Sequence, residues 1–114
     1  MRITTDLWAA ALVRRVFGSG GFAAILKRGS SEAGAAFVLS RNRLGELALY
    51  GPAPQTSYDG SRPNERLFVR IGEGQMPEEL EKRLEKEQRF DPDIWVVEIE
   101  SGSLPVEDLI LLAD

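Results

Sequence analysis

The feature that most restricts the fold is a series of three short apolar runs joined by short glycine-containing links. Residues 22–50 contain the runs "FAAILKR", "AAFVLS" and "ELALY", separated by "GSSEAG" and "RNRLG", so the links are only six and five residues long. A parallel pair of strands needs a crossover of about a dozen residues or more. The spacing therefore predicts a three-stranded antiparallel meander.

Two helices and two further strands are predicted outside this region. The stretch 6–17 follows threonines that suit an N-cap and precedes the glycine-rich "GSGG", which predicts a helix that ends there. The stretch 77–89 opens with a proline and two glutamates, which suit the first turn of a second helix. Alternating apolar residues at 66–71 and 94–100 predict two strands.

The order of these elements predicts a single α+β domain over residues 1–114, with two main helices and a mostly antiparallel sheet of about five strands. A chain of 114 residues with 43% hydrophobic residues is sufficient for one independent core. The segment 105–112 fits either a strand or a short helix, and both alternatives stay open.

Composition excludes several functional classes. The chain has neither cysteine nor histidine, which excludes disulfides, thiolate metal sites, cysteine nucleophiles and a Ser-His-Asp triad. The apolar run "LWAAALV" is followed directly by two arginines rather than by a cleavage site for export, and no run approaches the ~20 apolar residues of a membrane span. We therefore expect a cytoplasmic protein.

The first predicted helix is apolar on nearly every side. Its core stripe contains Trp8, Leu12 and Val16, with Val13 and Phe17 beside it. At 100° per residue, the opposite side carries Leu7, Ala10, Ala11 and Arg14. Such a helix is either deeply buried or in contact with a partner, so these four residues are the predicted interface of a homodimer or of a complex with another protein.

A long connection, "GPAPQTSYDGSRPNE" at 51–65, exceeds the usual length of a loop in a compact domain. Its prolines lower the entropic cost of ordering it, and its polar residues suit a binding loop. Tyr58, Asp59 and Arg62 are its candidate ligand-binding residues. A purely structural connection that covers a sheet edge remains the alternative.

The strand at 66–71 places Arg66, Phe68 and Arg70 on one face. Basic residues around an aromatic ring are typical of surfaces that bind single-stranded nucleic acid or phosphate, so Arg66 and Arg70 are candidate anion-binding residues. The alternative is that both arginines form cross-strand pairs with Glu98 and Glu100.

Four acidic residues lie close together in the sequence: Asp91, Asp93, Glu98 and Glu100. Carboxylates bind Mg²⁺ or Mn²⁺, which makes a carboxylate-metal enzyme a possible function. The two aspartates bracket a proline, however, as in an ordinary turn, and the two glutamates alternate along a strand. We therefore predict no metal site and no cofactor.

Several segments together resemble a family of small bacterial proteins known as domain of unknown function 1491. The segments are "DLWAAALVRRVFGSGGFAAILKRGSSEAGAAFV", "LYGPAPQTSYD", "RLF" and "FDPDIWVVEIE". The resemblance implies a stand-alone bacterial domain and transfers no catalytic residue.

Three functions remain at this point. The favoured hypothesis is a non-enzymatic interaction or ligand-binding module, because no nucleophile lies beside a base. The alternatives are a nucleic-acid or phosphoanion binder that uses the arginine-bearing strand, and the carboxylate-metal enzyme. The acidic isoelectric point of about 4.9 disfavours nucleic acid without excluding it.

Overall fold

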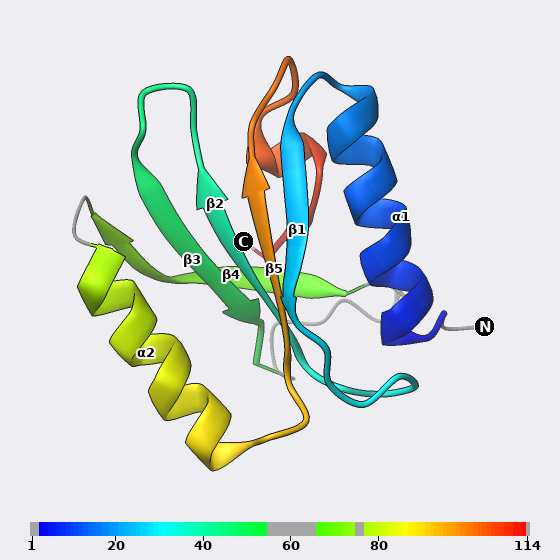
Figure 1. Ribbon diagram of the computed structural model, residues 1–114, viewed down its shortest axis with the longest axis vertical. Helices are drawn as coiled ribbons and strands as arrows, with labels where there is room; N and C mark the ends of the chain where they lie inside the picture. Colours follow the sequence, from blue (N-terminus) through cyan, green and yellow to red (C-terminus); the bar gives the residue numbers. More distant parts are fainter. Residues whose placement is uncertain (1–2, 55–65, 75–76, 114) are drawn as a thin grey trace.

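The computed structural model describes residues 3–54, 66–74 and 77–113, which form a six-stranded mixed sheet with one long helix packed on each face (Figure 1). The elements in chain order are α1 (Thr5–Gly18), β1 (Phe22–Lys27), β2 (Ala36–Arg41), β3 (Leu47–Pro52), β4 (Leu67–Gly74), α2 (Pro77–Phe90), β5 (Trp95–Glu100), the 3-10 helix η2 (Val106–Asp108) and β6 (Leu111–Leu112). Within the described ranges, no helix has the length and apolar character needed to span a membrane.

The predicted meander is wrong in one respect, because β5 lies between β1 and β2. The strand order is β1-β5-β2-β3-β4-β6 (Figure 1). β1 pairs antiparallel with β5 and β2 pairs parallel with β5, so β1 and β2 still run in opposite directions. The short link between β1 and β2 thus determined their relative direction but not their adjacency.

Two glycines allow the β1–β2 link to cross the chain that enters β5. A Cβ atom at Gly29 or Gly34 would collide with the backbone carbonyl of Asp93. The indole Nε1 of Trp95 donates a hydrogen bond of 2.6 Å to the carbonyl of Ser30 in the same link. The crossing therefore requires the absence of a side chain at both glycine positions.

The sheet is also less antiparallel and larger than the sequence predicted. Two of the five strand pairings, β2 with β5 and β4 with β6, are parallel. The sixth strand comes from the segment 105–112, which contains both the 3-10 turn η2 and the two-residue strand β6. The backbone N–H of Ala113 extends this edge by donating to the carbonyl of Phe68 at 2.8 Å.

Each helix covers its own core, largely as the helical periodicity predicted. Leu12 and Val16 of α1 are fully buried against one face of the sheet, and Trp8 packs against the same cluster. Leu80 and Leu84 of α2 pack on the opposite face, which was the predicted inner side of that helix.

Phe17 departs from the predicted core stripe of the first helix. It is 52% exposed, and its ring makes an edge-to-face contact with Phe22 at a centroid distance of 5.6 Å. Phe17 therefore packs against the first residue of β1, while Val16 in the same turn points into the core.

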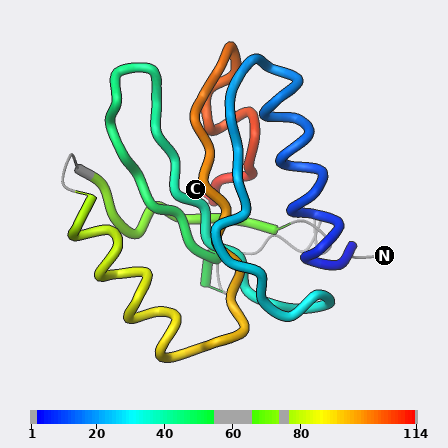
Figure 2. Tube along the Cα trace, in the orientation of Figure 1, coloured from blue at the N-terminus to red at the C-terminus, as the bar shows by residue number. Residues whose placement is uncertain are grey.

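Three segments that are distant in the sequence meet at one end of the sheet. The α1–β1 turn, the β2–β3 turn and the chain that follows β5 all lie there (Figure 2). This end of the sheet carries a cavity.

Candidate ligand-binding site

The cavity, called the sheet pocket below, has a volume of about 790 Å³ and is formed by three neighbouring strands and two loops. Ligand pockets commonly have volumes of about 300 to 1,000 Å³. Its floor contains Ser40, Ala48, Tyr50 and Arg70, and Glu73 lies beside it. Its walls are the β2–β3 turn at 42–46 and the segment 101–107.

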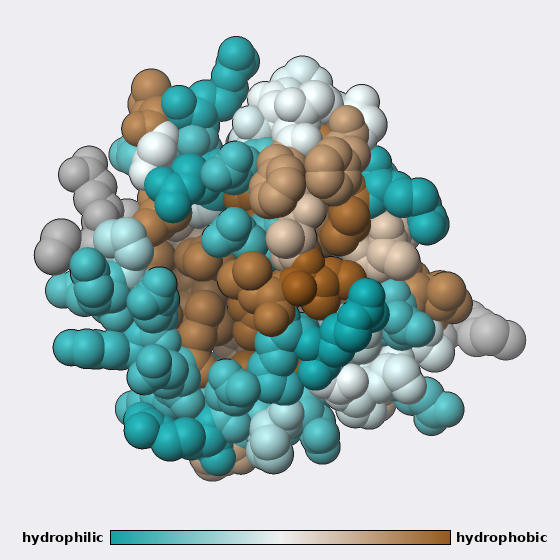
Figure 3. All heavy atoms as spheres, viewed as in Figure 1, coloured by the Kyte–Doolittle hydropathy of each residue, from teal (hydrophilic) through white to brown (hydrophobic). Residues whose placement is uncertain are grey.

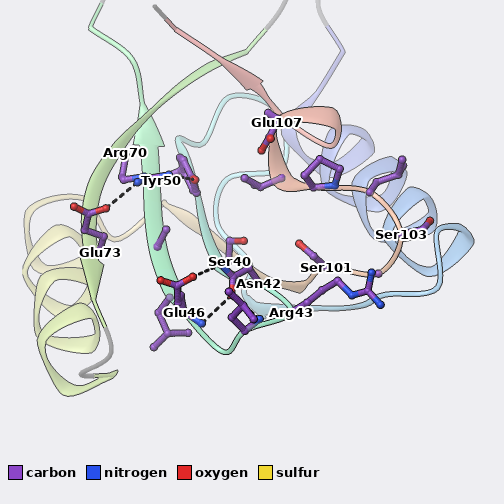
Figure 4. Close-up of a pocket in the computed structure, with 17 residues that line it drawn as sticks. Ser40, Asn42, Arg43, Glu46, Tyr50, Arg70, Glu73, Ser101, Ser103 and Glu107 are labelled. Atoms are coloured by element: carbon purple, nitrogen blue, oxygen red, sulfur yellow. Dashed lines mark hydrogen bonds and ion pairs between the residues drawn. The ribbon is translucent and has the colours of Figure 1, made fainter.

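Arg70 is held at the floor by two side chains (Figure 4). Its Nη2 donates to the hydroxyl of Tyr50 at 3.2 Å, and its Nη1 contacts Glu73 Oε2 at 2.8 Å. The guanidinium carbon also lies 5.7 Å from the centre of the Tyr50 ring. The hydrogen bond to Tyr50, followed by that to Glu73, raises the pKa of Arg70, so the cation is stabilised in this position.

Hydrogen-bonding capacity at the floor is not fully used by the described residues. Ser40 is only 4% exposed, and its hydroxyl makes no hydrogen bond within the described ranges. The Tyr50 hydroxyl accepts a hydrogen bond from Arg70 and makes no other bond to a described residue, so its own hydrogen is available. A guanidinium has more N–H groups than the two contacts of Arg70 use. The floor therefore presents several donors to a ligand.

The β2–β3 turn is a rigid wall because Asn42 binds its backbone. Asn42 Oδ1 accepts hydrogen bonds of 2.9 Å from the N–H groups of Leu44 and Glu46. Gly45 adopts a positive φ of 83°, which glycine allows without a steric penalty. Arg43 extends from this turn toward Ser101 and has no ion-pair partner among the described residues (Figure 4).

The second wall is attached to the turn that follows α1. Ser103 donates to the carbonyl of Ser19 through its backbone N–H at 2.8 Å and through its hydroxyl at 2.9 Å. A Cβ atom at Gly102 would collide with the backbone of Gly20 and Gly21, so the two segments are in direct backbone contact. The "GSGG" segment ends the helix as predicted, with Gly20 at a φ of 83°, and it also holds the pocket wall.

The structure separates the two predicted anion-binding arginines. Arg70 lines the sheet pocket, whereas Arg66 lies 5.9 Å from the ring centre of Trp8 and donates to the carbonyl of Ile3 at 2.9 Å. Phe68 between them is 2% exposed and stacks on Trp8, so it is not available to stack on a base. The strand therefore lacks the exposed aromatic ring on which the predicted nucleic-acid surface depended.

The predicted cross-strand ion pairs are also wrong. β2 and β3 separate β4 from β5, so Arg66 and Arg70 do not lie beside Glu98 and Glu100. Glu100 instead approaches Arg41 of β2 at 3.6 Å.

The structure does not assemble the four acidic residues into a metal site. Among the described residues, no three acidic side chains are grouped so that they could hold a metal ion. Asp91 instead accepts a hydrogen bond of 3.0 Å from the N–H of Asp93, which is the predicted turn geometry. Tyr58, Asp59 and Arg62 lie outside the described residues.

The outer face of α1, defined by Leu7, Ala10, Ala11 and Arg14, is accessible as the periodicity predicted. Leu7 is 60% exposed, Arg14 is exposed and the two alanines are half-buried. The sequence did not predict that Phe17 adds to this exposed apolar surface through its contact with Phe22 of β1, which is 46% exposed; Leu26 of β1 is also 54% exposed. Apolar side chains also gather over the middle of the sheet beside charged α2 (Figure 3).

The comparisons with known proteins agree with this fold. The family model described as "Protein of unknown function (DUF1491)" matches residues 3–105. The chain is 46% identical to protein Atu0922 from A. tumefaciens, whose solution structure has a TM-score of 0.83 over 100% of this chain and 97% of that one. No curated protein matches the chain.

Two structures of DUF1491 family proteins from Caulobacter crescentus CB15 are similar as well. The crystal structure at 1.87 Å is 35% identical, with a TM-score of 0.72 over 89% of this chain and 88% of that one. The NMR structure is 32% identical, with a TM-score of 0.78 over 100% of this chain and 99% of that one.

Proposed function

The chain belongs to the DUF1491 family of bacterial proteins of unknown function, and from the geometry of the sheet pocket we propose that it is a non-enzymatic module that binds a small organic anion. The observation that carries this proposal is Arg70, a cation held by Tyr50 and Glu73 at the floor of the pocket. Charge-assisted hydrogen bonds from its remaining N–H groups suit a carboxylate or phosphate. A cation that is already fixed loses less entropy when the ligand binds.

A binding role fits the pocket better than catalysis does. The only pocket serine with a side-chain hydrogen bond in the described ranges is Ser103, and it donates to a backbone carbonyl rather than to a base. An activated hydroxyl nucleophile needs a base within hydrogen-bond distance. The proposal includes a cytoplasmic location, which the absence of cysteine permits.

The charges around the pocket restrict where the acidic group of a ligand can lie. Arg43 and Arg70 line the pocket together with Glu46, Glu73 and Glu107. Glu73 is paired with Arg70, and Glu46 accepts a hydrogen bond of 2.9 Å from Asn42. The remaining carboxylate, on Glu107, would repel a second negative group near its own wall, whereas Arg43, which has no ion-pair partner among the described residues, would attract one near the β2–β3 turn.

Isothermal titration calorimetry with hexyl phosphate and with neutral hexanol tests this function. We expect the phosphate to bind and the alcohol to bind much more weakly. Arg70→Gln should weaken phosphate binding about 10- to 100-fold, because a hydrogen bond to a charged group contributes about 1.5 to 3 kcal/mol.

Arg83→Gln is the matched control for this experiment. Arg83 is also ion-paired with a glutamate, at 3.0 Å to Glu87, but it lies on α2 outside the pocket. The proposal fails if phosphate binding is absent, or if both variants weaken it equally.

A second candidate function is self-association through the outer face of α1, and the arrangement of its charges favours this role. Two copies of α1 packed antiparallel would place the small residues Ala10 and Ala11 at the centre of the contact. The same arrangement would bring Asp6 of one copy near Arg14 of the other. Both side chains are exposed, so the contact is complementary in charge as well as apolar.

A further inference from the structure

Two leucines at the edge of the sheet pocket are exposed although the pocket floor is polar. Leu44, in the β2–β3 turn, is 85% exposed, and Leu104, in the opposite wall, is 38% exposed. Neither belongs to either hydrophobic core. Pro105 and Val106 continue the apolar lining beside Leu104. Folding of the described chain leaves Leu44 in water beside a pocket whose lining also contains these other apolar residues, where a bound ligand could cover it.

Both leucines are carried by loops that are already held in place. The N–H of Leu44 itself donates to Asn42 Oδ1 at 2.9 Å, which fixes the turn. Leu104 directly follows Ser103, whose two hydrogen bonds to Ser19 anchor the wall. An apolar group on an ordered loop can contact a ligand without a large loss of loop entropy.

From these observations we propose that the ligand is an amphiphilic anion with one acidic head and an apolar tail. The inference rests on the proposed function. The head binds Arg70 and Tyr50 at the floor, and the tail passes between Leu44 and Leu104 at the mouth. A fully polar anion, such as a sugar phosphate, would leave both leucines in water. A second anionic end near this wall would also be repelled by the carboxylate of Glu107.

A series of methyl, butyl and hexyl phosphate, each titrated calorimetrically below its micelle concentration, tests the inference. We expect affinity to increase about two- to fourfold with each methylene group that the pocket covers. A Leu44→Ser/Leu104→Ser double variant should lose most of this dependence on chain length. Arg70→Gln should instead lower the affinity for all three phosphates by a similar factor and leave the dependence on chain length unchanged.

Phe90→Ser is the control, since Phe90 is 89% exposed on α2 and lies outside the pocket. If the double variant does not fold, Leu44→Ser alone provides the test at a position where the side chain is almost fully in water. The inference is overturned if methyl phosphate binds as tightly as hexyl phosphate, and the proposed function then stands. If none of the phosphates binds, both the inference and the proposed function are wrong. The inference is also overturned if affinity depends on chain length but the leucine variants leave this dependence unchanged.

Both free metabolites and acidic phospholipids can carry an acidic head and an apolar tail, and one further measurement distinguishes these two sources. Sedimentation of the protein with phosphatidylglycerol vesicles, reversed by hexyl phosphate, would support a lipid as the source. Binding of hexyl phosphate without sedimentation would support a soluble molecule.

Discussion

At the scale of single residues, the role of Arg70 depends on Tyr50. The tyrosine is 2% exposed, and its hydroxyl is nevertheless positioned to accept from the guanidinium at the edge of the core. The ring packs with Leu109 and Phe68 in the core beneath α1, so the hydroxyl is held by the packing of the ring. A buried aromatic side chain thus positions a half-exposed charge.

Tyr50→Phe removes the hydroxyl and keeps the ring. We expect the free energy of unfolding to fall by about 0.5 to 1.5 kcal/mol, since one hydrogen bond is lost. Affinity for hexyl phosphate should fall roughly 3- to 10-fold, because Arg70 loses a partner and the ligand loses a donor. A double-mutant cycle with Arg70→Gln should show coupling of at least about 0.5 kcal/mol in binding. Additive effects would contradict a joint action of the two residues.

At the scale of secondary-structure elements, the α1–β1 turn has two structural roles. It ends α1 through the backbone N–H groups of Ser19, Gly20 and Gly21, which bind the last carbonyls of the helix. It also accepts the hydrogen bonds of Ser103 and contacts Gly102 directly. The pocket wall is therefore attached directly to the turn that ends the helix.

Gly102→Ala tests this dependence. The added methyl group would collide with backbone atoms of the turn, so we expect unfolding free energy to fall by about 1 to 3 kcal/mol in urea denaturation. Hexyl phosphate should also bind more weakly, because the wall must move. Gly18→Ala is the matched control, since no atom lies within 4 Å of the added group and its φ is not positive. Equal stability of the two alanine variants would show that the close contact is not required.

At the scale of the whole molecule, two surfaces on different parts of the protein suggest two separate activities. The sheet pocket is lined by residues of β2, β3 and β4. The exposed apolar residues of α1 and β1 lie instead at the edge of the sheet that β1 forms. Leu7 and Leu26 do not line the pocket. We therefore expect that the proposed ligand binding and the proposed self-association respond to different substitutions.

Ala10→Glu places a charge at the centre of the proposed contact between two copies of α1. We expect a concentration-dependent dimer of the unaltered protein in sedimentation velocity and a monomer for the variant. Circular dichroism should be unchanged, because Ala10 is only half-buried. Hexyl phosphate affinity should also be unchanged.

Gln88→Glu adds the same charge at an exposed position of α2 and should leave the dimer intact. A monomeric unaltered protein at high concentration would refute self-association. Loss of folding in Ala10→Glu would instead show that this side of α1 is part of the core.

The sequence by itself determined the features that depend on near neighbours in the chain. Helical periodicity correctly placed Leu12, Val16 and Leu80 against the sheet, and alternation correctly separated the faces of β4 and β5. Turn chemistry correctly identified the end of α1 and the Asp91–Asp93 turn. These features rest on backbone geometry and on hydrogen bonds between residues a few positions apart, which a short stretch of sequence specifies.

Only the tertiary structure decided which strands are neighbours and which side chains share a site. Insertion of β5 between β1 and β2 depends on contacts between segments about 60 residues apart, such as Trp95 with Ser30. The same insertion separates Arg70 from Glu98, while the folded sheet brings Arg70 to Tyr50 and to the segment 101–107. Local patterns constrain the direction and faces of a strand, but its position in the sheet depends on the packing of the whole core, and the site depends on that position.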